Sequence, residues 1–235
     1  MKRTLAALGL VIAMAPLPAR TQSSIVSQIA GDKVATDRLY FSLKFGLNFA
    51  YLTGTTDTER TGGFNIGLTA TIRLAEKLSL VPEITPFSRK GVSEIPFVTT
   101  GDPALDAYFG EESESALALQ YVDIPVLVKY RLGRIQLGGG PFVGLLGSAP
   151  ERFRADLDTG EVLRFKRDVS GRYRKLDYGL VVEASWTIAK PRRGMGLVFH
   201  VRYQGGLSDI LADPAAAGSV RNSVIQAYLS FPFVH

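Results

Sequence analysis

His200 and His235 are the only histidines in the 235 residues, and hydrolysis at neutral pH needs a base of this kind beside a nucleophile. His200 alternates with Arg202 in one strand-like run, so both are expected to face the same side as Glu183 of the preceding run. Such surroundings are typical of a hydrogen-bonded structural histidine rather than of a catalytic base. His235 is the last residue. The sequence therefore predicts no catalytic residue, and we expect the protein not to be an enzyme.

Two short motifs could bind ligands on composition alone. The run LGGGPFVG, residues 137–144, is rich in glycine, but no P-loop lysine follows it and it lies within a strand pattern. The run TTDTER, residues 55–60, lacks the ligand spacing of a calcium loop. The chain has no cysteine, so thiolate metal sites and disulfides are excluded. We expect no metal site and no cofactor.

Apolar and polar residues alternate through most of the chain, as in β-strands with one apolar and one polar face. In YFSLKFGLNFAY, Phe and Leu share one face, while Ser42, Lys44 and Asn48 share the other. The pattern recurs eight times, in 40–51, 63–74, 78–90, 119–132, 135–147, 177–188, 195–204 and 223–233. Short connections near 75–77, 132–134 and 190–194 alternate with long ones near 52–62, 91–116, 148–174 and 205–222. This predicts an all-β fold, an eight-stranded antiparallel up-and-down transmembrane β-barrel with periplasmic turns and outer loops.

The same alternation would fit a soluble barrel with its faces inverted, so a lipocalin-like periplasmic carrier is the alternative fold. Two features favour the membrane. The polar face is rich in small residues and carries one or two charges per strand, as the crowded interior of a small barrel requires. The apolar face holds too much Phe and Leu to fit inside eight strands, and its aromatic residues cluster near the strand ends. We expect the apolar face to contact lipid.

The polar face carries charges of both signs, and each buried charge needs a partner. These charges are Lys44, Arg73, Lys129 and Arg202, with Glu83, Asp123, Asp177 and Glu183. We expect them to form a network that closes the lumen, in which either Lys129 or Arg202 pairs with Asp123. Pro82 and Pro125 each lack a ladder donor, so a bulge is expected at each.

The N-terminus has the features of an export signal. Lys2 and Arg3 precede an apolar stretch, residues 5–15, that is too short for a stop-transfer helix. Residues 1–22 are expected to be a cleaved signal peptide, 23–38 a periplasmic leader and 39–235 the barrel. The alternative for the first segment is a buried N-terminal helix. No later apolar run could form a transmembrane helix, so membrane insertion must use strands.

Two long loops carry opposite charges. The loop near 91–116 is acidic, and the loop near 148–174 is rich in arginine and lysine. Because guanidinium groups bind phosphate bidentately, Arg164, Lys166 and Arg167 are candidate contacts to lipopolysaccharide or an acidic partner. The alternative is that both loops are solvated extensions whose charges neutralise each other. Alternation in EVLRFKRDV, residues 161–169, predicts that the basic loop continues the strands above the membrane.

The segments KFGLNFAYLTG, GFNIGLTATIRLAEKLSLVPEI, LQYVDIPVLVKY, GGGPFVGLL and VRYQGGLSDI resemble successive strands of the PorT-like outer-membrane β-barrel family. The resemblance covers nearly all of 39–235, and its most specific piece is Y-x-D-I-P-x-L-x-K-Y at 121–130. It implies an eight-stranded barrel in the outer membrane of a Gram-negative bacterium, and similarity to one member implies a role in protein secretion. The chain departs from the family in ending FPFVH, so Phe233 is expected to supply the terminal aromatic residue.

These observations predict a non-enzymatic outer-membrane protein that acts through its outer loops or through partners, in secretion or envelope assembly. The expected partners are outer-membrane lipids, lipopolysaccharide and other envelope proteins. The net charge of +5 is modest and its basic excess lies in turns and one loop, which argues against nucleic acid. A lipid-modifying outer-membrane enzyme and the soluble carrier are the alternatives.

Overall fold

The computed structural model describes residues 38–54, 59–95, 103–106, 108–109, 114–157, 160–190, 194–213 and 218–234. Its strands are β1 (Leu39–Thr53), β2 (Glu59–Arg73), β3 (Leu78–Ser93), β4 (Glu114–Leu132), β5 (Ile135–Ser148), β6 (Pro150–Asp156), β7 (Val162–Asp168), β8 (Leu176–Ala189), β9 (Gly194–Met195), β10 (Leu197–Gly206) and β11 (Arg221–Val234). Two short helices are α3 (Pro103–Asp106) and η1 (Ser170–Arg172). Within the described residues, no helix has the length and apolar character needed to cross a bilayer. The predicted signal peptide, and the leader up to residue 37, lie outside the described residues.

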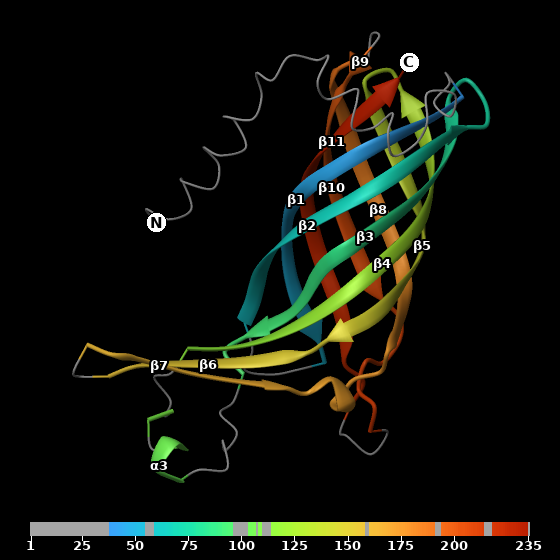
Figure 1. The fold of residues 1–235 in the computed structure, drawn as a ribbon. Coiled ribbons are helices and arrows are strands. Elements are labelled where there is room, and N and C mark those ends of the chain that lie inside the picture. Colours follow the sequence, from blue (N-terminus) through green and yellow to red (C-terminus); the bar gives the residue numbers. More distant parts are fainter. Residues whose placement is uncertain are drawn as a thin grey trace.

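Eight antiparallel strands close into a barrel. They follow the order β3-β2-β1-β11-β10-β8-β5-β4, and pairing of β3 with β4 closes the ring (Figure 1). The first and last strands of the chain pair along their length, from Phe41 opposite Phe233 to Thr53 opposite Arg221. The end of β11 lies at the same end of the barrel as the short turns, and the long connections lie at the other end. The predicted fold class is confirmed.

The alternating faces point as predicted. On β1, Phe45, Leu47 and Phe49 are 41–48% exposed on the outer surface, whereas Lys44 and Asn48 are buried inside. The same division holds on β4, where the outward row of alternate residues Val122 to Tyr130 is apolar and the inward row holds Asp123 and Lys129. A soluble barrel would place its apolar row inside and its charges outside, which is the reverse of this arrangement.

The bulges lie elsewhere than predicted. Pro82 pairs with Val126 of β4 without a shift in register, and Pro125 pairs likewise with Phe142 of β5. Each proline has no ladder partner on its other side, so the missing donor is accommodated by local loss of pairing rather than by an extra residue. The register shifts in the described sheet lie between Thr85 and Ser88, between Gln120 and Tyr121, and between Leu197 and Val198.

The extra residue in β3 changes which of its residues face the lumen. Before the shift, Glu83 and Thr85 point inward; after it, Ser88 and Lys90 do. A strand of period two reverses its faces whenever one residue is inserted. Because odd-numbered residues face inward before the shift, uninterrupted alternation would place Lys90 on the outer face. The extra residue turns Lys90 into the lumen instead.

The long connection between β5 and β8 forms an antiparallel hairpin, β6–β7, which confirms that the strand pattern continues beyond the barrel. β6 pairs with the first residues of β4, from Glu114 opposite Arg154 to Leu117 opposite Glu151. The hairpin projects sideways from the loop end of the barrel (Figure 1). Inside the barrel, at the end that carries the hairpin, lies an apolar cluster of buried residues: Leu52, Val92, Leu117, Leu119, Tyr121, Ala149, Val169, Ile210 and Val220.

Candidate functional sites: the lumen charges and the outer hairpin

Five buried charges from five strands meet in the lumen. Lys44 Nζ lies 2.7 Å from Glu83 Oε2, and Lys129 Nζ lies 2.5 Å from Glu183 Oε1. Arg202 joins the two pairs: Nη2 donates to Glu83 Oε1 at 2.8 Å, and Nε donates to Glu183 Oε2 at 2.8 Å. All five side chains are buried. Charges withdrawn from water in this way need such partners, because an unpaired one costs several kcal/mol, about 3–5 when a partner is removed.

A second group of charges lies nearer the outer mouth. Lys90 Nζ is 3.0 Å from Asp123 Oδ1 and 3.0 Å from Asp177 Oδ2. The other oxygen of each carboxylate also accepts a hydrogen bond: Gln204 donates to Asp123 Oδ2 at 2.9 Å, and Ser208 donates to Asp177 Oδ1 at 2.7 Å. Asn222 donates to Asp177 Oδ2, the oxygen that also pairs with Lys90, at 2.9 Å. The first group has three cations and two glutamates, and the second has one cation and two aspartates. The positive and negative charges of the two groups therefore cancel.

Most of the eight predicted lumen residues belong to one of these two charge groups. Seven of the eight line the two groups, namely Lys44, Glu83, Asp123, Lys129, Asp177, Glu183 and Arg202. Arg73 does not: it is half-buried and lines a cavity of about 470 Å³ at the end of the barrel that holds the short turns. Lys90 was missed, because the shift in β3 was not visible in the alternation. Asp123 consequently pairs with Lys90, and the two predicted partners, Lys129 and Arg202, bind glutamates instead.

Ser230, His200 and Glu183 lie in a row that has the spacing of a hydrolytic triad. His200 Nε2 is 2.8 Å from Ser230 Oγ, and His200 Nδ1 is 2.9 Å from Glu183 Oε1. The imidazole stacks on the ring of Tyr228, with centroids 4.4 Å apart. All three members are buried, and Glu183 is shared with Lys129 and Arg202. None of the three residues lines the cavity of about 470 Å³ at the end of the barrel that holds the short turns, so a molecule in that cavity would not contact the serine.

The outer hairpin has one basic face. Arg152 lies opposite Lys166, and Arg154 lies opposite Arg164, so all four point the same way, and all four are exposed. Arg154 also contacts Asp156 at 3.1 Å and Glu114 at 3.4 Å. These are solvent-exposed pairs, worth about 0–1 kcal/mol each, and they leave the face cationic.

The other face of the hairpin is apolar and carries the remaining predicted arginine. Phe153 and Phe165 stack with centroids 6.1 Å apart, and Phe109 packs against both. Arg167 lies on this side and pairs with Glu151 at 2.5 Å. The three predicted contact residues are therefore not one surface: Arg164 and Lys166 share the basic face, and Arg167 belongs to the opposite one.

The basic face is a continuation of the barrel's outer surface. Arg152 lies opposite Ala116, which belongs to the same outward row of β4 as Ile124 and Val128. In Figure 1, α3 lies on the side of the hairpin away from the barrel. The apolar face, which packs against Phe109, continues the inward row of β4, because Phe153 lies opposite Ser115. The outward row thus changes from hydrocarbon to arginine where the sheet leaves the barrel.

Residues 26–212 match the family model described as outer membrane protein beta-barrel domain. The chain belongs to this family. It is an outer-membrane β-barrel protein, and its apolar outer surface contacts lipid; this excludes the soluble carrier. The match ends before β11, whose pairing with β1 closes one seam of the ring.

The chain is similar to several solved outer-membrane proteins at low identity. Neisserial surface protein A is 12% identical with a TM-score of 0.40, covering 83% of this chain and 96% of its own. Ail of Yersinia pestis is 10% identical with a TM-score of 0.38, covering 83% and 97%. OprG from Pseudomonas aeruginosa is 15% identical with a TM-score of 0.38, covering 87% and 100%. No curated protein matches the sequence.

Proposed function

We propose that the protein is a non-enzymatic, closed outer-membrane barrel that holds the β6–β7 hairpin over the outer leaflet, where its basic face binds the phosphates of lipopolysaccharide. The carrying observation is the continuity of the outward row of β4 with that face, through Ala116 opposite Arg152. A sheet that leaves the hydrocarbon and bends outward presents this row to the headgroup layer. Two strands hold the four cations in fixed positions, which reduces the entropy lost on binding.

The chemistry of the face suits phosphate. Three of its four cations are arginines, whose planar guanidinium groups donate two parallel hydrogen bonds to an anionic oxygen pair. Exposed cations near an anionic membrane surface contribute about 1 kcal/mol each. The alternative of two loops that neutralise each other has less support. The one ion pair between the loops among the described residues, Arg154 with Glu114, is exposed and weak, and Arg167 pairs with Glu151 within the basic loop itself.

The closed lumen and the absence of catalysis are parts of the same proposal. The two charge groups and the apolar cluster at the outer mouth fill the interior of eight strands, which is only wide enough for side chains. The buried position of the Ser230–His200–Glu183 row supports a structural role. The strand YVDIPVLVKY supports the finer PorT-like assignment, and with it contacts to other envelope proteins in secretion or assembly.

The test is thermal melting of the detergent-solubilised barrel with added lipopolysaccharide, since a ligand that binds only the folded state raises the melting temperature. We expect a rise that weakens as salt is added, and expect Arg164→Ser/Lys166→Ser to lose most of it while melting normally without ligand. Dephosphorylated lipopolysaccharide should give no rise with either protein.

Two control variants sharpen this test. Arg134→Ser/Lys190→Ser removes two exposed cations at the opposite end of the barrel and should respond like the parent. Arg167→Ser breaks the pair with Glu151 and should lower melting without changing the response to ligand. If the basic-face variant responds to lipopolysaccharide as strongly as the parent at low salt, the hairpin is not the binding surface.

A further inference from the structure

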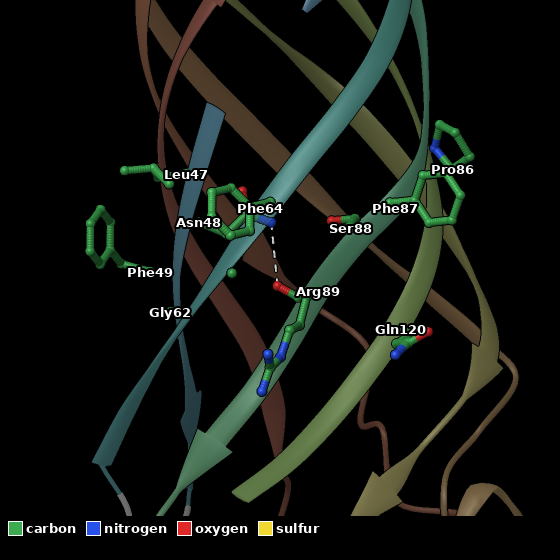
Figure 2. Close-up of a pocket in the computed structure, with 11 residues that line it drawn as sticks. Leu47, Asn48, Phe49, Gly62, Phe64, Pro86, Phe87, Ser88, Arg89 and Gln120 are labelled. Carbon is green, nitrogen blue, oxygen red and sulfur yellow. Dashed lines mark hydrogen bonds between the residues drawn. The ribbon is translucent and has the colours of Figure 1, made fainter. Parts of the chain in front are cut away.

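The barrel wall has one long interruption between β2 and β3. Ladder pairs join Leu68 to Ile84 on one side and Arg60 to Val92 on the other, and none joins the residues between them. Backbone groups that face hydrocarbon must find partners, so an open ladder within a membrane barrel is costly unless something else occupies it. Within the interruption, Asn48 of β1 donates a hydrogen bond from Nδ2 to the Arg89 carbonyl of β3, at 3.3 Å (Figure 2).

A groove with a volume of about 460 Å³ lies at this interruption, within the range of small-ligand sites. Its outer part is lined by Leu47, Phe64 and Phe87 (Figure 2), of which the two phenylalanines are 66% and 67% exposed on the lipid side. Gly62 leaves it open, because a Cβ there would meet no atom within 4 Å. The groove therefore opens from the hydrocarbon side of the wall.

The inner part of the groove is polar, and two of its donors, on Ser88 and Arg89, lack partners among the described residues. Ser88 lines it and is 1% exposed, and its hydroxyl has no hydrogen-bond partner among the described residues. The Arg89 Nε is buried and equally without a partner there. Arg89 also makes no ion pair with any described carboxylate, and another cation, Arg152, repels it electrostatically. Its guanidinium points toward the outer end of β3 (Figure 2).

We propose that this groove binds one acyl chain of a phosphate-bearing lipid of the outer leaflet, whose phosphate pairs with Arg89. The chain would cover Phe64 and Phe87 on the hydrocarbon side, and the anionic headgroup would neutralise a cation that is otherwise isolated in the wall. A long arginine side chain that reaches toward the interface is the usual means of placing such a charge. The groove lies on β2 and β3, beside Arg152 of the hairpin. Because the proposed function is tested at Arg164 and Lys166 and the groove is tested at Arg89, the two proposals can fail independently.

The experiment uses tryptophan quenching by lipids with brominated acyl chains. The sole tryptophan, Trp186, is replaced by Phe, and a reporter is placed in the groove as Phe64→Trp or, separately, Phe87→Trp. Brominated phosphatidylglycerol, whose phosphate gives the headgroup a net negative charge, is compared with brominated phosphatidylcholine, whose phosphate is neutralised by its own choline ammonium group. We expect both reporters to prefer phosphatidylglycerol by about tenfold, as for one charge-assisted hydrogen-bonded pair. A Val182→Trp reporter on β8, across the ring from the groove, should show no preference.

Two variants test the two halves of the site. Arg89→Gln should abolish the preference while leaving quenching itself. Gly62→Leu should reduce quenching at the groove, whereas Gly171→Leu, where a Cβ also meets nothing, should not. The proposal is overturned if the groove reporters show no more preference than Val182→Trp, if the preference survives Arg89→Gln, or if neither lipid quenches them because another protein chain covers the groove.

Discussion

Lys90 of β3 lies 3.0 Å from Asp123 of β4 inside the barrel, although Lys90 is paired across the sheet with Leu119 and Asp123 with Thr85. The register shift between Thr85 and Ser88 turns the lysine inward and lets its side chain reach down to the aspartate. Its ammonium group also lies 4.5 Å from the centre of the Tyr121 ring. The contact depends on the bulge as much as on either residue.

Removal of the aspartate should therefore destabilise the barrel. Asp123→Ala leaves Lys90 with Asp177 alone and leaves the Gln204 amide without its acceptor. We expect the free energy of unfolding in denaturant to fall by about 2–4 kcal/mol, near the usual cost of breaking a buried pair. Asp156→Ala is the control, because its pair with Arg154 is exposed and should cost no more than about 1 kcal/mol. Equal losses in the two variants would contradict the inward assignment.

Removal of the lysine should cost more than removal of one aspartate. Lys90→Met leaves Asp123 and Asp177 buried without their shared cation. One of the carboxylates can then be relieved only by taking up a proton. We expect this variant to unfold at lower denaturant concentration than Asp123→Ala at pH 7, and the difference to narrow at pH 4. A Lys90→Met barrel as stable as the parent at pH 7 would show that the three groups do not interact strongly.

The barrel should conduct poorly. Arg202 spans between Glu83 and Glu183, and the Tyr228 hydroxyl also donates to Glu183 across the lumen. An eight-stranded interior leaves no aqueous path once such side chains fill it. Planar-bilayer recordings of the purified protein should show little stable conductance. Large and regular open-channel steps would contradict the proposed closed lumen.

The serine beside His200 should be unreactive. A triad serine reacts readily with fluorophosphonate probes because its base is poised and its hydroxyl is accessible. Ser230 and His200 are buried, and the histidine is locked between Ser230 and Glu183. We expect no labelling of the folded barrel. Labelling of the parent that disappears in both Ser230→Ala and His200→Gln would instead indicate a hydrolase.

Most of the barrel was predictable because its physics is local. Alternation of Phe and Leu with Lys44 and Asn48 in one short run already defines a strand and its two faces. The small residues and sparse charges of the polar face, and the bulk of the apolar face, then indicate that the apolar face meets lipid. Lengths of turns and loops then define the topology. A hairpin in the basic loop was predictable for the same reason, since EVLRFKRDV carries the same period.

The misplaced residues share a different cause. A proline in a strand can be accommodated by a bulge or by a local loss of pairing. Which of these occurs depends on the neighbouring strand toward which its nitrogen points, and the alternation of the sequence does not indicate that strand. Lys90 was missed because one extra residue in β3 decides which of its residues face the lumen. Arg73 was included in the network, but it lies at the turn end of the barrel, outside both charge groups. The groove was invisible for a related reason: it comes from pairs that β2 and β3 do not make.

The loop between β10 and β11 should loosen in acid. Asp209 accepts hydrogen bonds from the Leu211 and Val220 amides, both at 3.1 Å, and so ties the two ends of the loop together. The bond from Leu211, more than any other contact, lowers the pKa of Asp209 below its ordinary value. A lowered folded-state pKa means that the stabilisation is complete above the unfolded pKa, about 3.9, and is lost as pH falls through the folded value.

Hydrogen exchange of the two amides is the direct measurement of this effect. After correction for the intrinsic rate, we expect their protection to be constant from about pH 7 to 5 and to fall below the unfolded pKa of about 3.9. In Asp209→Asn, protection should be lower and independent of pH. The Leu146 amide, which donates to the Lys175 carbonyl at 2.8 Å, has a backbone acceptor and should not follow the same curve. If the protection of Leu211 and Val220 in the parent does not change through this range, the carboxylate does not hold the loop.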